Sequence, residues 1–341
     1  MGILDWFKNR PSQFETETPS SEELDKAIDK AITLTNPRLK LLRAYQSQLA
    51  PAVRHTLDYL RESIVALPKP IQISEANWGA EPVLRAFFVG SSDIPATFGY
   101  SRNLRTFFDK FPTVNSAYVV LGVAYDEQLV DGVAMQGDIL QRDIAQKVAN
   151  FSVPRIRICG HTEAEIKHLL GNQSFEYLVA QSMLEIGEVR SELQDLEENR
   201  ALIRARLRIL QQQGPGLGSL FEVAPLGGTE QQKLESQLLE NERQMEELGS
   251  SQEILETELG FLCKVLQAPE RYIRFEQNTV RLNTLNVIVD HQSSDVASDV
   301  VFSMALLDGL PKARRAFVLG RMDRAELPQE RINFAAAERL L

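Results

Sequence analysis

The sequence has few of the features that mark disulfide-stabilised or membrane-spanning proteins. Its 341 residues include two cysteines, Cys159 and Cys263, which are too few for a disulfide framework. No apolar run approaches the roughly eighteen residues that a membrane-spanning helix requires. Residues 1–11 lack the hydrophobic region and cleavage site of a secretory signal. We therefore expect a cytoplasmic protein that works in a reducing compartment.

Motifs that mark enzymes are also missing. The sequence contains no GxSxG, HExxH, Walker or dinucleotide-binding pattern. Cys159, His161 and His168, completed by His55 or His291, would supply metal-ligand atoms, but no pair among them has the spacing typical of zinc ligands. We interpret these residues as structural and predict no catalytic residue, no metal and no cofactor. An enzyme with an unrecognised site is kept as an alternative.

Negative charge is concentrated in one part of the chain. The net charge is −10, and residues 161–266 hold 19 acidic against 9 basic residues, which accounts for all of it. The remainder has 28 residues of each sign and is neutral. Phosphate binding needs a cationic surface that releases counterions. The charge distribution therefore disfavours a nucleic acid as the main partner.

Residues 22–111 have the pattern of a helical N-terminal part, preceded by a linker at residues 12–21. Ser20 and Glu23 have the spacing of a capping box, and Asn36 with Pro37 restarts the helical pattern. Pro51 is expected to kink or split the helix that follows. Between Trp78 and Phe111 the chain is rich in phenylalanine with interleaved arginine. We interpret this stretch as a helical core rather than as a base-stacking surface.

Residues 112–170 and 267–341 have the sequence pattern expected of an α+β body. Short β-branched or alternating runs occur at 117–125, 133–148 and 155–159, and again at 272–275, 280–282, 285–289, 300–307 and 316–319. Thr162 and Glu165 form a capping box for a short helix that would end near His168. The expected fold is an α+β domain with N-terminal helices and a mixed or antiparallel sheet.

Residues 171–266 repeat apolar positions in alternating steps of three and four. The first arm begins at Asn172, and its positions are Phe175, Val179, Ser182, Ile186, Val189, Leu193, Leu196, Arg200, Ile203, Leu207 and Leu210. The second arm has Leu234, Leu238, Asn241, Met245, Leu248, Gln252, Leu255, Leu259, Leu262 and Leu266. This is the seam of a coiled coil, and the two arms match when the chain folds back on itself. We predict a long antiparallel coiled-coil hairpin inserted between strands.

Polar residues at and beside this seam suggest how the arms are aligned. Asn241 and Gln252 occupy seam positions and are expected to fix the register. Arginines and glutamates flank the seam at the same level of the hairpin, and we predict ion pairs between them rather than a ligand site. They are Arg200, Arg204, Arg206 and Arg208 on the first arm, and Glu240, Glu242, Glu246 and Glu247 on the second.

The turn of the hairpin, residues 214–228, is unusually apolar. Its large side chains are Leu217, Leu220, Phe221, Val223 and Leu226. The Gly214–Gly218 stretch resembles a phosphate loop only superficially, because the Lys-Ser/Thr pair is missing. Large apolar residues at the end of a projection favour a docking surface for a protein partner or a second copy of the chain. The alternative is a tip that folds on itself and caps the seam.

Two further segments have the composition of contact sites. Residues 1–11 place Ile3, Leu4, Trp6 and Phe7 close together in an amphipathic segment with cations on its other side. This pattern is typical of a membrane-surface anchor or a hook into a partner, although the segment could also pack on its own domain. Near the C-terminus three cations could contact an anion or lipid headgroup, unless they are only a solvated loop. They are Lys312, Arg314 and Arg315.

Taken together, these patterns favour a non-enzymatic interaction or scaffold protein. Its acidic coiled-coil hairpin would dock through the apolar tip into a partner or a symmetry mate. A peripheral membrane adaptor held by residues 1–11 is the alternative function.

Overall fold

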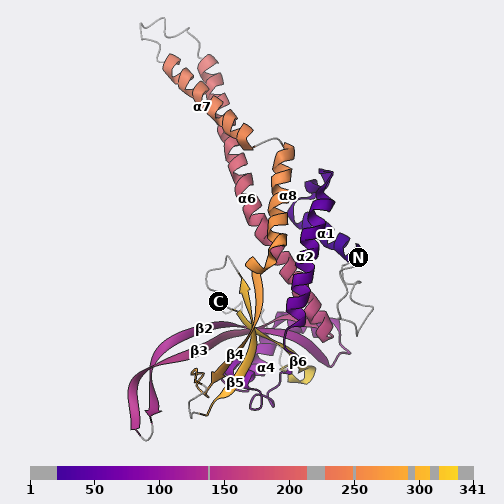
Figure 1. Cartoon of the computed structure of the whole chain (residues 1–341), viewed down its shortest axis with the longest axis vertical. Coiled ribbons are helices and arrows are strands. Elements are labelled where there is room, and N and C mark those ends of the chain that lie inside the picture. Colours follow the sequence, from indigo (N-terminus) through magenta and orange to yellow (C-terminus); the bar gives the residue numbers. More distant parts are fainter. Residues whose placement is uncertain are drawn as a thin grey trace, which may run out of the picture. The chain divides into compact units, whose positions relative to one another are not determined.

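The computed structural model describes residues 21–136, 139–212, 227–248, 251–290, 296–307 and 315–328 (Figure 1). These residues form two compact units. The sheet unit contains residues 57–175 and 268–328, and the helical unit contains residues 21–56 and 176–267. No helix within the described ranges combines the length and the apolar character needed to cross a bilayer.

The sheet unit is built on a curled sheet whose main strands are antiparallel. The strands are β1 (Ile71–Gln72), β2 (Ser116–Gln136), β3 (Ile139–Gly160), β4 (Ile273–Leu282), β5 (Ser298–Leu307) and β6 (Arg315–Asp323). Their order is β3-β2-β6-β5-β4, and β1 pairs in parallel with β6. Strands from before and after the long helices therefore lie in one sheet. This confirms the α+β class and the mixed or antiparallel sheet predicted from the sequence, since the main strands are antiparallel and β1 alone among the described strands is parallel to its neighbour.

Short helices supply much of the core of the sheet unit. These helices are α3 (Pro82–Phe87), α4 (Asp93–Tyr100) and α5 (Arg102–Lys110), and Ser101 begins α5 by accepting a hydrogen bond from the Leu104 N–H at 3.3 Å. Phe88, Phe98 and Phe108 are fully buried. They belong to the same core cluster as sheet residues such as Leu121. The aromatic stretch is thus a helical core, as predicted.

The helical unit contains the long helices of the chain. Its helices are α1 (Ser21–Thr35), η2 (Pro37–Leu41), α2 (Tyr45–Val65), α6 (Glu163–Gln212), α7 (Gly227–Leu248) and α8 (Ser251–Gln267). The end of α2 and the start of α6 belong to the sheet unit. Two 3-10 turns, η4 (Pro269–Arg271) and η5 (Arg324–Glu326), complete the sheet unit. The helices α6, α7 and α8 lie between β3 and β4 in the chain order.

Two helix boundaries differ from the sequence-based expectation. The predicted capping box is present, because the His161 N–H donates to Glu165 Oε2 at 2.7 Å and the Glu165 N–H donates to Thr162 Oγ1 at 3.1 Å. The helix that it starts does not end near His168 but continues into the long arm, since no proline follows within it. Helix α2 likewise runs through Pro51 without a break. Pro51 is the seventh residue of α2, so its ring removes one backbone hydrogen bond, the one to the Ser47 carbonyl, and the helix continues on both sides of it.

Helices α6 and α7 run side by side (Figure 1), and polar contacts join them. Arg204 Nη2 lies 2.9 Å from Glu242 Oε1, an ion pair between the predicted sets of charges. Asn241 Nδ2 donates to the Leu196 carbonyl at 3.0 Å. Leu207 and Leu234 are buried. The two helices therefore lie close together along this stretch.

Strands β2 and β3 are longer than their sequence pattern predicts. They pair from Tyr118 opposite Gly160 to Gln136 opposite Ile139, whereas β6 accompanies β2 only from Ser116 to Ala124. The run Asp126–Asp131 is mostly polar, so it carries no alternating apolar signal. Beyond Ala124 the pair continues as a long extension, which we call the ribbon (Figure 1), and residues 286–288 bond to β3 along its first part.

Candidate functional site: a buried polar clamp beside a groove

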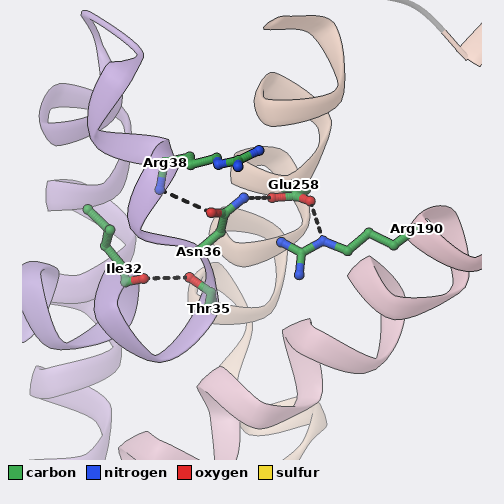
Figure 2. Close-up of polar contacts among 6 residues, drawn as sticks. All are labelled: Ile32, Thr35, Asn36, Arg38, Arg190 and Glu258. Atoms are coloured by element: carbon green, nitrogen blue, oxygen red, sulfur yellow. Dashed lines mark hydrogen bonds and ion pairs between the residues drawn. The ribbon is translucent and has the colours of Figure 1, made fainter. Parts of the chain in front are cut away.

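A polar cluster of the helical unit centres on the buried Glu258 of α8. Glu258 is 3% exposed. Asn36 Nδ2 donates to its Oε2 at 2.6 Å, and Arg190 Nε of α6 lies 2.6 Å from its Oε1 (Figure 2). Each carboxylate oxygen thus has a partner from a different helical segment. We call these three side chains the clamp.

The local sequence places Asn36 in the clamp. Asn36 follows α1, and its Oδ1 accepts a hydrogen bond from the Arg38 N–H at 3.0 Å, which begins η2 with Pro37 at the first position (Figure 2). This use of a short polar side chain before proline is typical of helix starts. The amide oxygen therefore fixes the turn while the amide nitrogen reaches α8.

Electrostatics make the clamp a strong constraint on these helices. A buried carboxylate is costly unless it is paired and hydrogen-bonded. The hydrogen bond to Glu258 raises the pKa of the Arg190 guanidinium above its ordinary value. The Arg190 side chain keeps 45% of its surface exposed, whereas the Glu258 side chain keeps 4%. Glu258 therefore depends on its partners more than Arg190 does.

Other contacts join helices of the helical unit. Thr56 Oγ1 of α2 donates to the Leu266 carbonyl at 2.6 Å. Lys264 Nζ lies 3.0 Å from Glu185 Oε2, and Lys30 Nζ lies 2.6 Å from Glu176 Oε1. Together these bonds tie α1, α2 and α8 to α6 within the helical unit.

An open groove of about 1070 Å³ lies beside the clamp. It is lined by Asn36, Arg38, Leu41, Leu42, Arg43, Ala44, Gln48, Arg190, Gln252, Ile254, Leu255, Glu256, Glu258 and Leu259. Its surface combines exposed cations with apolar side chains, of which Leu41 is 75% exposed. Such a surface has the chemistry to contact an amphipathic, acidic ligand. Within the described residues no group of three metal-ligating side chains comes together.

The residues predicted to bind partners fall largely outside the described ranges. Both the tip (Leu217, Leu220, Phe221, Val223 and Leu226) and the N-terminal group (Ile3, Leu4, Trp6 and Phe7) lie there, as do Lys312 and Arg314. Arg315 is described as the exposed first residue of β6, where it lies opposite Ala124 and Ala305. These predictions stay open.

The histidines and Cys159 that were weighed as metal ligands have separate surroundings. The His161 ring packs on Phe107 and Phe111, with centroid distances of 4.9 and 4.3 Å. His168 is buried, and its Nε2 lies 2.7 Å from Asn172 Nδ2. Burial raises the pKa of the Cys159 thiol to about 12, so this cysteine is a poor nucleophile at neutral pH.

Sequence reasoning identified Asn36 as a helix cap but not its bond to Glu258, and it missed Glu258 and Arg190. Asn36 was identifiable as a cap because Pro37 follows it. Nothing distinguishes Glu258 or Arg190 from the many charged residues that flank the seam. Comparison with protein-family models, curated proteins and solved structures gives no match. The function is therefore argued from this chain alone.

Proposed function

We propose that this chain is a non-enzymatic interaction scaffold that presents α6 and α7 as an antiparallel coiled-coil hairpin to a protein partner. The observation that supports this most is the length of α6. It contains 50 residues, which corresponds to about 75 Å at 1.5 Å per residue. Helices of globular proteins average about a dozen residues. A helix this long reaches well beyond what a small core needs.

The exposure of leucines on the two helices supports a narrow seam. Leu207 and Leu234 are 9% and 6% exposed, whereas Leu202 of α6 and Leu239 of α7 are 53% and 71% exposed. An apolar stripe restricted to one side is the pattern of a coiled coil rather than of helices embedded in a core. The ion pair between Arg204 and Glu242 beside this stripe is consistent with such a seam.

In this proposal the clamp holds the near end of the hairpin. Arg190 and Glu258 join α6 to α8, and Asn36 joins α8 to the helix start at Pro37. A rigid base lets a distant contact be made without loss of much conformational freedom on binding. The far end, residues 214–228, would supply the docking surface through its five large apolar side chains.

The test replaces Leu220 and Phe221 of the full-length chain by serine. In a pull-down, we expect the immobilised double variant not to retain the proteins that the immobilised wild-type chain retains, because the apolar area that drives docking is removed. Its melting temperature should stay unchanged. The matched control is Leu202→Ser, which removes an exposed leucine from the side of α6. Equal retention by the tip variant and the wild type, or equal loss in the control, would contradict the proposal.

A further inference from the structure

The groove beside the clamp combines a buried apolar floor with an exposed rim. Leu42 and Leu259 are 8% and 1% exposed, and Ile254 and Leu255 are half-buried. Leu41 stands at the rim with 75% of its surface exposed. A buried apolar centre within a polar rim is the anatomy of a protein-binding surface. All residues that line the groove belong to the helical unit, so one compact unit forms it.

Two arginines of the groove carry charges that the chain does not neutralise. Arg38 and Arg43 are exposed, and within the described part of the chain neither guanidinium has an ion-pair partner. The glutamates of the lining are already engaged. Glu258 belongs to the clamp, and Glu256 Oε1 accepts from Gln252 Nε2 at 3.0 Å. With three arginines against two glutamates, the groove is locally basic in a chain whose net charge is −10.

The clamp holds the walls of the groove in place. Asn36 Nδ2 and Arg190 Nε each lie 2.6 Å from an oxygen of Glu258, and all three residues line the groove. Their bonds join α8 to α6 and to the turn that carries Arg38, whose side chain extends toward α8 (Figure 2). A ligand therefore meets a preformed surface, which reduces the conformational entropy lost on binding.

The form of the groove favours a helix as its ligand. Small-molecule sites enclose most of their ligand, whereas this groove is open and places an exposed leucine at its rim. Its described walls come from η2, α2, α6, α8 and the turn before α2, so a strand would find no sheet edge with which to pair. An α-helix satisfies its own backbone hydrogen bonds and needs only side-chain contacts.

The α8 wall of the groove has the length for a short helical contact. Gln252, Leu255 and Leu259 recur in steps of three and four residues, and residues 252–259 extend about 10 Å at 1.5 Å per residue. A helix laid along this wall would contact it with about two turns, through apolar side chains spaced three and four residues apart. Carboxylates beside that apolar stripe would complement Arg38 and Arg43.

We propose that the groove binds an acidic amphipathic helix of a partner protein. The apolar stripe of the partner covers Leu41 and the leucines of the floor, and its carboxylates pair with Arg38 and Arg43. This inference assigns the helical unit a docking surface of its own. It uses no residue of the hairpin tip, so it does not rest on the proposed scaffold contact.

Fluorescence anisotropy with a labelled synthetic helix tests the chemistry of the ligand. The probe has about fifteen residues, with leucine every three or four positions and glutamate or alanine elsewhere. Measurements in about 0.15 M salt screen the net charge of the chain. We expect saturable binding to the full-length chain, and about tenfold weaker binding of a probe with glutamine in place of glutamate. Equal binding of both probes, or no binding of the acidic probe, would overturn the proposal.

Paired charge variants locate the probe on the groove. The double variant Arg38→Gln with Arg43→Gln should bind the acidic probe about tenfold more weakly, because two charge-assisted contacts are lost. Arg54→Gln is the matched control, since Arg54 is an exposed cation of α2 outside the groove. It should bind like the wild type. Unchanged binding by the double variant, or an equal loss in the control, would refute the proposal.

Leu41→Ser tests the apolar part of the contact. Leu41 is 75% exposed, so serine removes apolar area from the rim without opening the core. We expect several-fold weaker binding of the acidic probe and an unchanged melting temperature. The matched control is Leu239→Ser, which alters a leucine of α7 that is 71% exposed and lies outside the groove. Equal affinities of the Leu41→Ser and Leu239→Ser variants would contradict the proposed contact.

Three further measurements separate other occupants of the groove. Probe binding that appears only after residues 1–20 are deleted would assign the groove to the chain's own N-terminal segment. A dimer in sedimentation that the Arg38→Gln, Arg43→Gln double variant loses would assign it to a second copy. Flotation with phosphatidylserine vesicles that the same variant loses would assign it to a lipid surface. Each of these results would refute a helical protein partner, and we expect none of them.

The tip variant with serine at positions 220 and 221 separates the two proposals. It should bind the acidic probe like the wild type even if its tip no longer retains partner proteins. Loss of probe binding in this variant would place the probe on the hairpin tip and refute binding in the groove.

Discussion

Arg190 and Glu258 share one hydrogen bond, yet their removal should have unequal effects. Arg190→Leu leaves a carboxylate that is 3% exposed with only Asn36 as its partner. Uncompensated buried charges lower the free energy of unfolding by about 3–5 kcal/mol. Glu258→Gln keeps an acceptor for Asn36 and leaves a guanidinium that water still reaches, so we expect a loss of only about 1–1.5 kcal/mol.

Urea denaturation of the two single variants measures this difference. Equal losses of unfolding free energy would show that Glu258 is not the dependent partner. The double variant adds a further check, because two residues in direct contact should not give additive effects.

Local signals explain which individual residues could be predicted from the sequence. Thr162 with Glu165, and Asn36 with Pro37, act within one helical turn, so spacing alone identified them. The bond between Asn36 and Glu258 joins residues 222 positions apart. One sequence gives no information about which of many distant polar residues meet. The clamp therefore became visible only in the folded chain.

At the scale of elements, Gly320 shows how a single residue allows β1 to join the sheet. A Cβ atom at position 320 would lie 2.1 Å from Cδ1 and 2.7 Å from Cγ1 of Ile73, which is fully buried. Gly320→Ala must therefore displace Ile73 or separate β1 from β6. Overpacking of this kind typically costs about 1–3 kcal/mol.

Gly122 of β2 provides the matched control for this prediction. A Cβ atom there meets its nearest neighbours, two backbone oxygens, at 3.9 Å, which is ordinary van der Waals contact. We expect Gly122→Ala to melt within a few degrees of the wild type and Gly320→Ala to melt clearly lower, as measured by circular dichroism. Similar melting temperatures for both variants would contradict the close packing of β1 on β6.

Strands could be predicted from the sequence where one of their faces is buried. Their extent could not be predicted where both faces are exposed to water. The buried β2 stretch from Ala117 to Tyr125 has a dense apolar pattern, and the sequence predicted it as a strand. The ribbon that follows exposes both faces, so no alternation marks Gln128 or Asp131 as strand residues. Helix α6 was predicted to begin at Asn172 because two helical patterns were read separately. Its true start at Glu163 joins them.

For the whole molecule, the most informative prediction was that the chain comes back to the sheet after the long helical stretch. Two antiparallel arms bring the chain back to where it left, so strands on either side of them can share one sheet. The structure confirms the shared sheet, since β2 and β3 belong to the same sheet as β4, β5 and β6. The order of the strands was not predictable, because strand patterns do not specify their neighbours. Local sequence patterns also could not predict which polar groups form the clamp.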